Sequence, residues 1–118
     1  MTTQQIADRL VELCRKGEYT AAQEELYADD AVSIEPDGSP GLKTVTGRDA
    51  IVQKGHNFMA MIEEVHSSEV SDAVIAGDHF AVAATFEATF KGMGRQVMAE
   101  ICVYSVKDGK IVKEQFIY

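Results

Sequence analysis

The sequence predicts an α+β domain in which helices come first and a run of strands follows. Apolar residues recur at helical spacing in the N-terminal half, and the period changes to two from Val65 onward. Helical and strand segments are therefore segregated along the chain, which favours an α+β layer arrangement over βαβ units. With 118 residues, 46% hydrophobic and 25% charged, the chain has the size and composition of one domain over residues 1–118.

Three N-terminal helices are predicted, over residues 2–17, 20–27 and 47–64. Thr2 with Gln5, and Thr20 with Gln23, have the spacing of a capping box, which marks the start of a helix. In the first and third segments apolar residues then recur every three or four positions. We expect these helices to pack on one face of a sheet.

Five strands are predicted. They cover residues 31–35, 65–76, 79–90, 95–106 and 111–118. The last four are rich in β-branched and aromatic residues, and short glycine-containing turns separate them. Connections of this length join antiparallel neighbours, so we expect a curved sheet that is antiparallel or mixed.

Residues 97–106 carry apolar side chains on both faces of the predicted strand. A sheet that is apolar on both sides must be covered on both sides. Since the helices cover one face, we expect a second copy of the chain to cover the other, which predicts a homodimer. The alternative is a sheet that curves enough to bury more of itself.

The net charge is −8, from 11 Lys and Arg against 19 Asp and Glu. This balance disfavours nucleic acid and anionic membranes as partners. The cations are unevenly placed, because no Lys or Arg occurs between Gly55 and Phe90. The start of the sequence does not have the pattern of a secretory signal, and no apolar run approaches the length of a spanning helix. We therefore expect a cytoplasmic protein.

The residues that commonly bind metals or form disulfides lack the spacing for either role. Cys14 and Cys102 form no CxxC pair, so they are expected to be free, buried thiols. His56, His66 and His79 occur without an HxH or HExxH motif. We expect neither a metal nor a cofactor.

Several segments, taken in order, resemble the NTF2-like superfamily, and the SnoaL-like and ketosteroid-isomerase-like branches are the nearest. The matching segments are Lys16–Glu18, Leu26–Val32, Gly47–Ile51, Gly77–Val82 and Asp108–Val112. The resemblance implies a strongly curved sheet wrapped round a helix, a cone-shaped pocket between sheet and helices, and dimers formed through the outer face of the sheet. It does not fix an activity, because enzymes, binding proteins and assembly domains share this fold.

Ketosteroid isomerase needs a carboxylate base and two donors to a dienolate oxygen. By comparison with that enzyme, the base falls on Glu35, immediately before Pro36, and the donors fall on Leu10 and Cys102. Leucine has no donor, and a thiol is a weak one. Because losing one oxyanion donor costs about 3 kcal/mol of transition-state stabilisation, we do not expect steroid isomerisation by this mechanism.

The resemblance also implies a set of pocket residues. Glu35, His56 and Glu100 are the candidate catalytic residues. The candidate ligand-pocket residues are Phe58, Met59, Phe86, Met98, Cys102, Tyr104, Glu114, Phe116 and Tyr118. Carboxyl groups crowded into apolar surroundings do not all ionise easily, so one of them is suited to acid–base chemistry near neutral pH.

Each polar candidate also has an ordinary structural interpretation. Glu35 would be solvated at the pocket mouth, and His56 would be a surface histidine. Glu100 would form an ion pair at a dimer interface with Arg95 or Arg48. Glu114 would form an exposed cross-strand pair with a lysine.

Two functions remain open. The first is a cofactor-independent enzyme of the isomerase or cyclase type, with Glu35 as general base and Tyr104, His56 or Glu100 as polar partners. The second is a non-catalytic domain for small-molecule binding, dimerisation or assembly. A small organic molecule is the expected ligand of the pocket.

Overall fold

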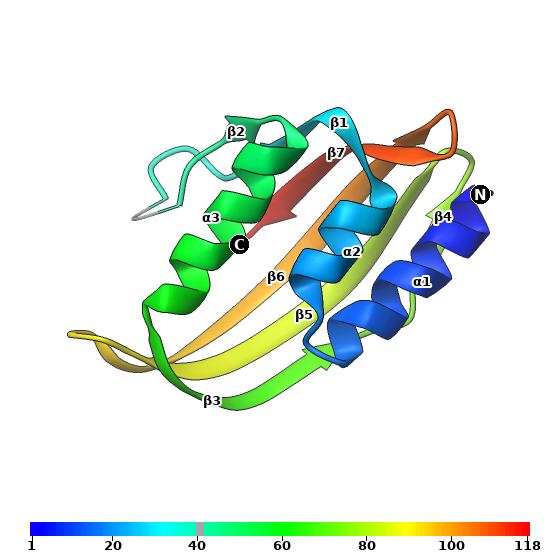
Figure 1. Cartoon of the computed structure of the whole chain (residues 1–118). Helices are drawn as coiled ribbons and strands as arrows, with labels where there is room; N and C mark the ends of the chain where they lie inside the picture. The colour runs from blue at the N-terminus through cyan, green and yellow to red at the C-terminus, as the bar shows by residue number, and fades with distance from the viewer. Residues whose placement is uncertain (40–41) are drawn as a thin grey trace.

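The computed structural model describes residues 1–39 and 42–118. Its helices are α1 (Thr3–Arg15), α2 (Tyr19–Leu26) and α3 (Arg48–Ala60). Its strands are β1 (Tyr27–Ile34), β2 (Val45–Thr46), β3 (Ile62–Val70), β4 (Val74–Ala76), β5 (His79–Phe90), β6 (Gly94–Lys107) and β7 (Lys110–Ile117). The predicted α+β class is confirmed (Figure 1).

The expectation of three N-terminal helices is wrong in its order, because only α1 and α2 precede the first strand. The chain forms β1 and β2 before it enters α3. Val32 of β1 pairs with Thr46 of β2, and the next strand position pairs Ser33 with Val45. The β-branched residues Val45 and Thr46 suit this short strand, which sequence inspection did not reveal.

The two predicted capping boxes have different outcomes. At α1 the Thr2 hydroxyl accepts from the Gln5 amide, and the Gln5 side chain accepts from the Thr2 amide, so the first box is confirmed. At α2 the N-cap is Glu18, two residues before the predicted cap Thr20, and no side chain caps the helix. The Thr20 hydroxyl, which was expected to cap α2, bonds to the side chain of α3 residue His56.

The sheet is mixed, with strand order β2-β1-β7-β6-β5-β3 and β4 paired to β5. Among the strands that the structure describes, β1 and β7 form the single parallel pair, and the other pairs are antiparallel. The predicted strand 65–76 is divided into β3 and β4 at Ser71. There the Ser71 hydroxyl accepts from the Ala83 amide, so a side chain replaces a backbone group in the ladder.

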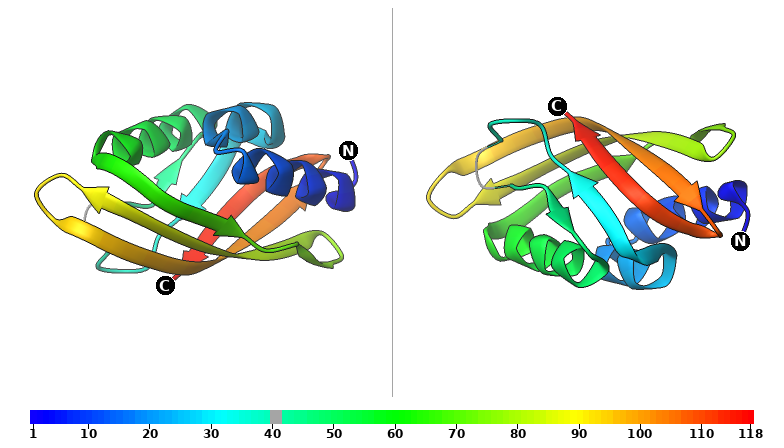
Figure 2. Two further views of the ribbon diagram at one scale, coloured as in Figure 1. Left: turned by 90° about the horizontal axis from the view of Figure 1, so that it is seen from below. Right: turned by 90° about the horizontal axis from the view of Figure 1, so that it is seen from above.

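All three helices lie on one face of the sheet, and the other face carries no helix (Figure 2). The core forms between α1, α2 and the inner face, where Ile6, Leu26 and Ile111 are almost completely buried. Phe80 of β5 stacks on Tyr104 of β6 at a ring separation of 4.7 Å. The even-numbered residues of β5 and β6 that pair across the two strands therefore face the helices.

Among the described residues, no helix is long and apolar enough to cross a membrane.

Candidate functional site

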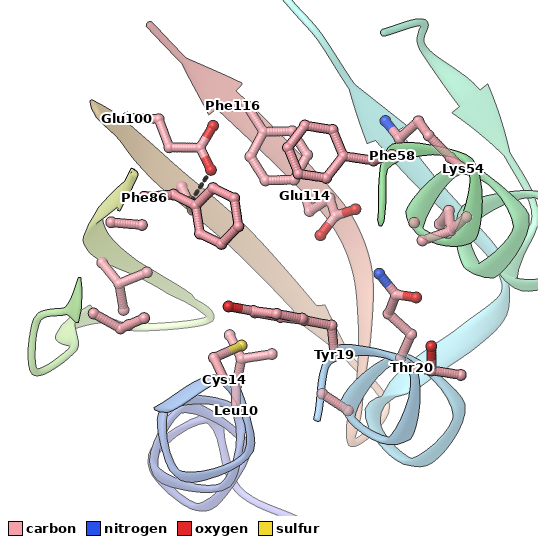
Figure 3. A pocket seen from close by; sticks show the side chains of 18 of the residues that line it. Leu10, Cys14, Tyr19, Thr20, Lys54, Phe58, Phe86, Glu100, Glu114 and Phe116 are labelled. Atoms are coloured by element: carbon pink, nitrogen blue, oxygen red, sulfur yellow. Dashed lines mark hydrogen bonds between the residues drawn. The ribbon is translucent and has the colours of Figure 1, made fainter. Parts of the chain in front are cut away.

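A cavity of about 630 Å³ lies between the inner face of the sheet and the three helices. Side chains from every helix and from β1, β3, β5, β6 and β7 line it (Figure 3). Most of the lining is apolar, and the charged residues in it are Glu18, Glu35, Lys54, Glu100 and Glu114. These few charged groups decide what chemistry the cavity offers.

Glu35 and Lys54 form a buried ion pair at the cavity wall. The Lys54 Nζ donates to Glu35 Oε2 at 2.9 Å, and the two side chains are 14% and 4% exposed, lysine first. The hydroxyl of Tyr118, the residue after β7, donates to Glu35 Oε1 at 2.8 Å. Both carboxylate oxygens of Glu35 are thus held in place, and Glu35 is buried rather than solvated at a pocket mouth.

A second carboxylate continues this network into the core. Lys54 Nζ donates to Ser33 Oγ at 2.7 Å, and the parallel pairing of β1 with β7 sets Ser33 beside Glu114. The Tyr27 hydroxyl donates to Glu114 Oε1. Burial raises the pKa of the Glu114 carboxyl, and the hydroxyls of Tyr27 and Ser33 partly offset that rise. The predicted exposed pair between Glu114 and a lysine is therefore wrong.

Glu100 lies on β6, apart from this network. Its Oε1 accepts from the Cys102 thiol at 3.6 Å, which is a weak hydrogen bond. Burial raises the pKa of the Glu100 carboxyl, and the thiol contact partly offsets the rise. Arg95 pairs with Glu87 and Arg48 pairs with Asp29, so neither of the expected arginines pairs with Glu100.

The wall of the cavity includes aromatic rings from α2, α3, β5 and β7. The Phe58 ring of α3 packs edge to face against Phe90 at a centroid separation of 5.7 Å, and it is tilted against the Phe86 ring of β5 at a centroid separation of 6.0 Å. Phe116 of β7 lies with its ring centroid 5.5 Å from Lys54 Nζ. Tyr19 of α2 also lines the cavity, and its hydroxyl bonds to Ser68 at 3.2 Å. The wall thus suits an apolar ligand with a flat or cationic part.

The structure brings most of the predicted site residues to the cavity. Those that line it are Glu35, Phe58, Met59, Phe86, Met98, Glu100, Cys102, Tyr104, Glu114 and Phe116. Tyr118 is not part of the lining and reaches the site through its bond to Glu35. His56 is exposed and bonds to Thr20 at 3.1 Å, outside the lining, because the face of α3 toward the cavity carries Ile51, Gly55 and Phe58 instead.

The positions where the ketosteroid isomerase comparison places oxyanion donors also lie at the cavity. Leu10 is buried there and offers no donor. Burial raises the pKa of the Cys102 thiol, and it raises the pKa of Cys14 to about 11. Both cysteines are free, and both are thiols rather than thiolates near neutral pH, so neither is an activated nucleophile. Within residues 1–39 and 42–118, no three His, Cys, Asp or Glu side chains form a group that could hold a metal ion.

Sequence inspection missed Lys54, Ser33 and Tyr27, which hold the two buried carboxylates. One signal for Lys54 was available: it follows Ile51 by three positions and precedes Phe58 by four, so it occupies the apolar face of its helix. A charged residue on such a face marks a buried pair or a site. Tyr27 and Ser33 gave no comparable signal, because their bonds depend on the pairing of β1 with β7.

Comparison with known proteins identifies the family to which this chain belongs. The family model of the SnoaL-like domain matches residues 1–118. A proposed SnoaL-like polyketide cyclase from Mesorhizobium loti is 36% identical, with a TM-score of 0.91 and all of both chains covered. The curated proteins contain no match. The fold is therefore NTF2-like, and the chain belongs to the SnoaL-like family.

Two further solved structures share the fold. A protein from Catenulispora acidiphila with a ketosteroid isomerase-like fold, solved in complex with trimethylamine, is 25% identical with a TM-score of 0.74. The match covers 99% of this chain and 87% of that one. IdmH, a proposed polyketide cyclase from Streptomyces antibioticus, is 22% identical with a TM-score of 0.73, over 99% of this chain and 91% of that one.

Proposed function

We propose that the chain is a cofactor-independent enzyme of the isomerase or cyclase type, acting on a small organic molecule held in the cavity. The observation that carries this proposal is the Glu35–Lys54 pair, a buried carboxylate beside an ammonium at the wall of an apolar cavity. A carboxylate that accepts two hydrogen bonds has further lone pairs for a substrate proton. The 36% identity to a proposed polyketide cyclase supports the same class of reaction.

In this reaction Glu35 removes a proton from a carbon next to a substrate carbonyl. The electrons of the C–H bond move toward the carbonyl, negative charge collects on its oxygen, and Glu35 becomes a neutral acid. In an isomerase Glu35 then returns the proton to a different carbon. In a cyclase the enolate carbon forms a bond to a second carbonyl carbon, whose oxygen takes up the proton.

Lys54 supplies the charge that this step needs. Before proton transfer its ammonium is the counter-ion of Glu35, and after transfer it is the counter-ion of the substrate oxyanion. The positive charge therefore compensates one negative charge in both states. In this proposal Lys54 takes the part of the two donors that are missing at Leu10 and Cys102.

The base can be tested without the natural substrate by using 5-nitrobenzisoxazole. A carboxylate that removes the C–H proton of this compound causes its N–O bond to break, and the coloured product is a cyanonitrophenolate. We expect the protein to accelerate this reaction, and Glu35→Gln to lower kcat/KM by about 100-fold, the lower end of typical general-base contributions. Glu69→Gln is the matched control, because Glu69 is exposed on β3 and lies outside the cavity lining.

An unchanged rate in Glu35→Gln would remove the base assignment. The second candidate function is non-catalytic binding of a small organic molecule, and the lack of a strong hydrogen-bond donor at Leu10 and Cys102 favours it. If the wild-type protein binds apolar compounds and does not accelerate the elimination, this result would favour the second function.

We also propose that the chain forms a homodimer through the outer face of its sheet. This face exposes Val97, Ile101 and Ile117, with 64%, 42% and 53% of their surfaces accessible. Ile101 pairs with Ile117 across β6 and β7, so the exposed apolar side chains are contiguous. Helices α1, α2 and α3 all lie on the opposite face (Figure 2). We expect sedimentation velocity to show a dimer that Ile101→Lys converts to a monomer, and a monomeric wild type at micromolar concentration would contradict this.

A further inference from the structure

The cavity holds more negative charge than its one cation compensates. Of the charged residues that line it, Lys54 is the single cation, and its ammonium is already bonded to Glu35. Glu114 keeps two hydroxyl partners inside the protein. Glu18, the remaining carboxylate of the lining, is exposed to solvent. Glu100 is left as the half-buried carboxyl group that forms no ion pair within the described part of the chain.

Glu100 has no cationic partner among the residues that the structure describes. Its one hydrogen-bond partner there is the Cys102 thiol, at 3.6 Å. A carboxylate that is partly removed from water without a cation or a strong donor is costly, and a positively charged ligand would remove that cost.

Aromatic rings flank Glu100 on both sides. Glu100 pairs with Ala84 of β5, which places Phe86 one diagonal step away on the same face. On the other side Cys102 pairs with Phe116 of β7, which is the equivalent diagonal neighbour. Figure 3 shows the Glu100 carboxylate and both rings at the same part of the cavity. Ring faces and a carboxylate are the two groups that bind organic ammonium ions.

Much of the cavity wall comes from a segment of the sequence that has no lysine or arginine. No Lys or Arg occurs between Gly55 and Phe90. That segment contributes the cavity wall made by Gly55, Phe58, Met59, Ser68, Val70, Val82, Ala84 and Phe86. No lysine or arginine from the end of α3, from β3 or from β5 therefore competes with a cationic ligand near Glu100.

We infer that the cavity selects an organic cation, namely an apolar molecule that carries a protonated amine or a quaternary ammonium, and that Glu100 is its counter-ion. The inference rests on the proposed function only in placing the ligand in this cavity, and it does not require catalysis. Combined with the proposed reaction, it describes the substrate as an apolar amino ketone, with its nitrogen at Glu100 and its reacting carbon at Glu35. Anionic ligands of the same shape are rejected.

The test compares three probes that share one apolar body: 3-phenylpropylamine, 3-phenylpropan-1-ol and 3-phenylpropanoate. We expect calorimetry at pH 7.5 to show that the amine binds at least about 10-fold more tightly than the alcohol, which is the effect of one charge-assisted hydrogen bond. The carboxylate should bind most weakly. Equal affinities of the amine and the carboxylate would overturn the inference.

Glu100→Gln locates the counter-ion. We expect this substitution to lower amine affinity by about 10-fold and to leave alcohol affinity within about twofold. Glu69→Gln, which removes one negative charge outside the cavity lining, is the control for the net charge of the protein and should leave both affinities unchanged. Equal losses for amine and alcohol in Glu100→Gln would show a general loss of the cavity and would overturn the assignment.

A measurement on the unaltered protein makes the test independent of how the variant folds. The amine should raise the Tm of the wild type at concentrations where the carboxylate does not, because a ligand stabilises the state that binds it. The two proposals also fail separately. A strong amine preference without elimination activity removes the proposed enzyme and leaves this inference standing, and the converse result removes only this inference.

Discussion

The cavity has two polar regions that differ in how their charges are compensated. In the paired region, Glu35 bonds to Lys54 and Tyr118, and Glu114 bonds to Tyr27. In the unpaired region, Glu100 has a thiol as its one partner among the described residues. The two regions lie in one cavity and both contain half-buried or buried carboxyl groups. The side chains of the paired region are therefore held in place by one another, whereas Glu100 has no strong partner within residues 1–39 and 42–118.

The largest expected effect comes from breaking the paired region with Lys54→Met. This substitution leaves the Glu35 carboxylate buried without its cation, and removing one partner of a buried ion pair costs about 3–5 kcal/mol. We expect urea unfolding at pH 7.5 to show a loss of this size in the free energy of unfolding. Lys91→Met, at the exposed turn after β5, should change it by less than about 0.5 kcal/mol.

A second variant separates the ion pair from the rest of the Lys54 side chain. Glu35→Gln combined with Lys54→Met removes both charges, so we expect the double variant to be more stable than Lys54→Met alone. A double variant that is no more stable than Lys54→Met would mean that Lys54 stabilises the protein by packing on Phe116, without a contribution from charge.

The sequence was sufficient for the class of fold and insufficient for the distinction between the two regions. The change from helical to strand spacing predicted the α+β arrangement, because that spacing is a local property of the chain. The bond from Tyr27 to Glu114 joins residues 87 positions apart, and it depends on β1 lying parallel to β7. No local pattern encodes that pairing, so Glu114 had an exposed lysine partner as its ordinary interpretation.

Tyr27 illustrates the same limit at the start of a strand. In the sequence it follows a helix-tolerant segment and is the last residue of the helix predicted over residues 20–27. In the structure it is the first residue of β1 and is buried against Glu114. Helix propensity correctly predicts a helix for the residues before Tyr27. The conformation of Tyr27 itself depends on the tertiary contacts of its phenol ring.

An intermediate effect on the free energy of unfolding is expected from the ionisation of Glu114, which makes the stability of the protein depend on pH. Its pKa is raised above 4.5 in the folded state. In the pH range between 4.5 and the folded-state pKa, the folded protein therefore binds more protons than the unfolded chain. The contribution of Glu114 to stability is present below pH 4.5 and is lost as the pH rises through the folded-state pKa. Over that interval the slope approaches at most about 1.4 kcal/mol per pH unit.

Glu114→Gln should remove this slope while it keeps an acceptor for the Tyr27 hydroxyl. We expect the difference in the free energy of unfolding between variant and wild type to move in favour of the variant as the pH rises from 4.5. Urea titrations at half-unit pH steps measure that difference. A difference that stays constant with pH would show that Glu114 ionises equally well in the folded and unfolded chain.

The smallest expected effect is that of Glu100→Gln on stability, and it is the most informative about the unpaired region. When a residue stabilises the fold through its charge, as we expect of Lys54, removing that charge lowers the free energy of unfolding of the protein. Burial raises the pKa of Glu100, so its ionised form is a cost to the folded state rather than a contribution. We therefore expect the free energy of unfolding of Glu100→Gln at pH 8 to equal or slightly exceed that of wild type, within about 1 kcal/mol. A loss above about 2 kcal/mol would place Glu100 with the paired carboxylates Glu35 and Glu114, because such a loss requires an internal partner that a ligand would have to displace.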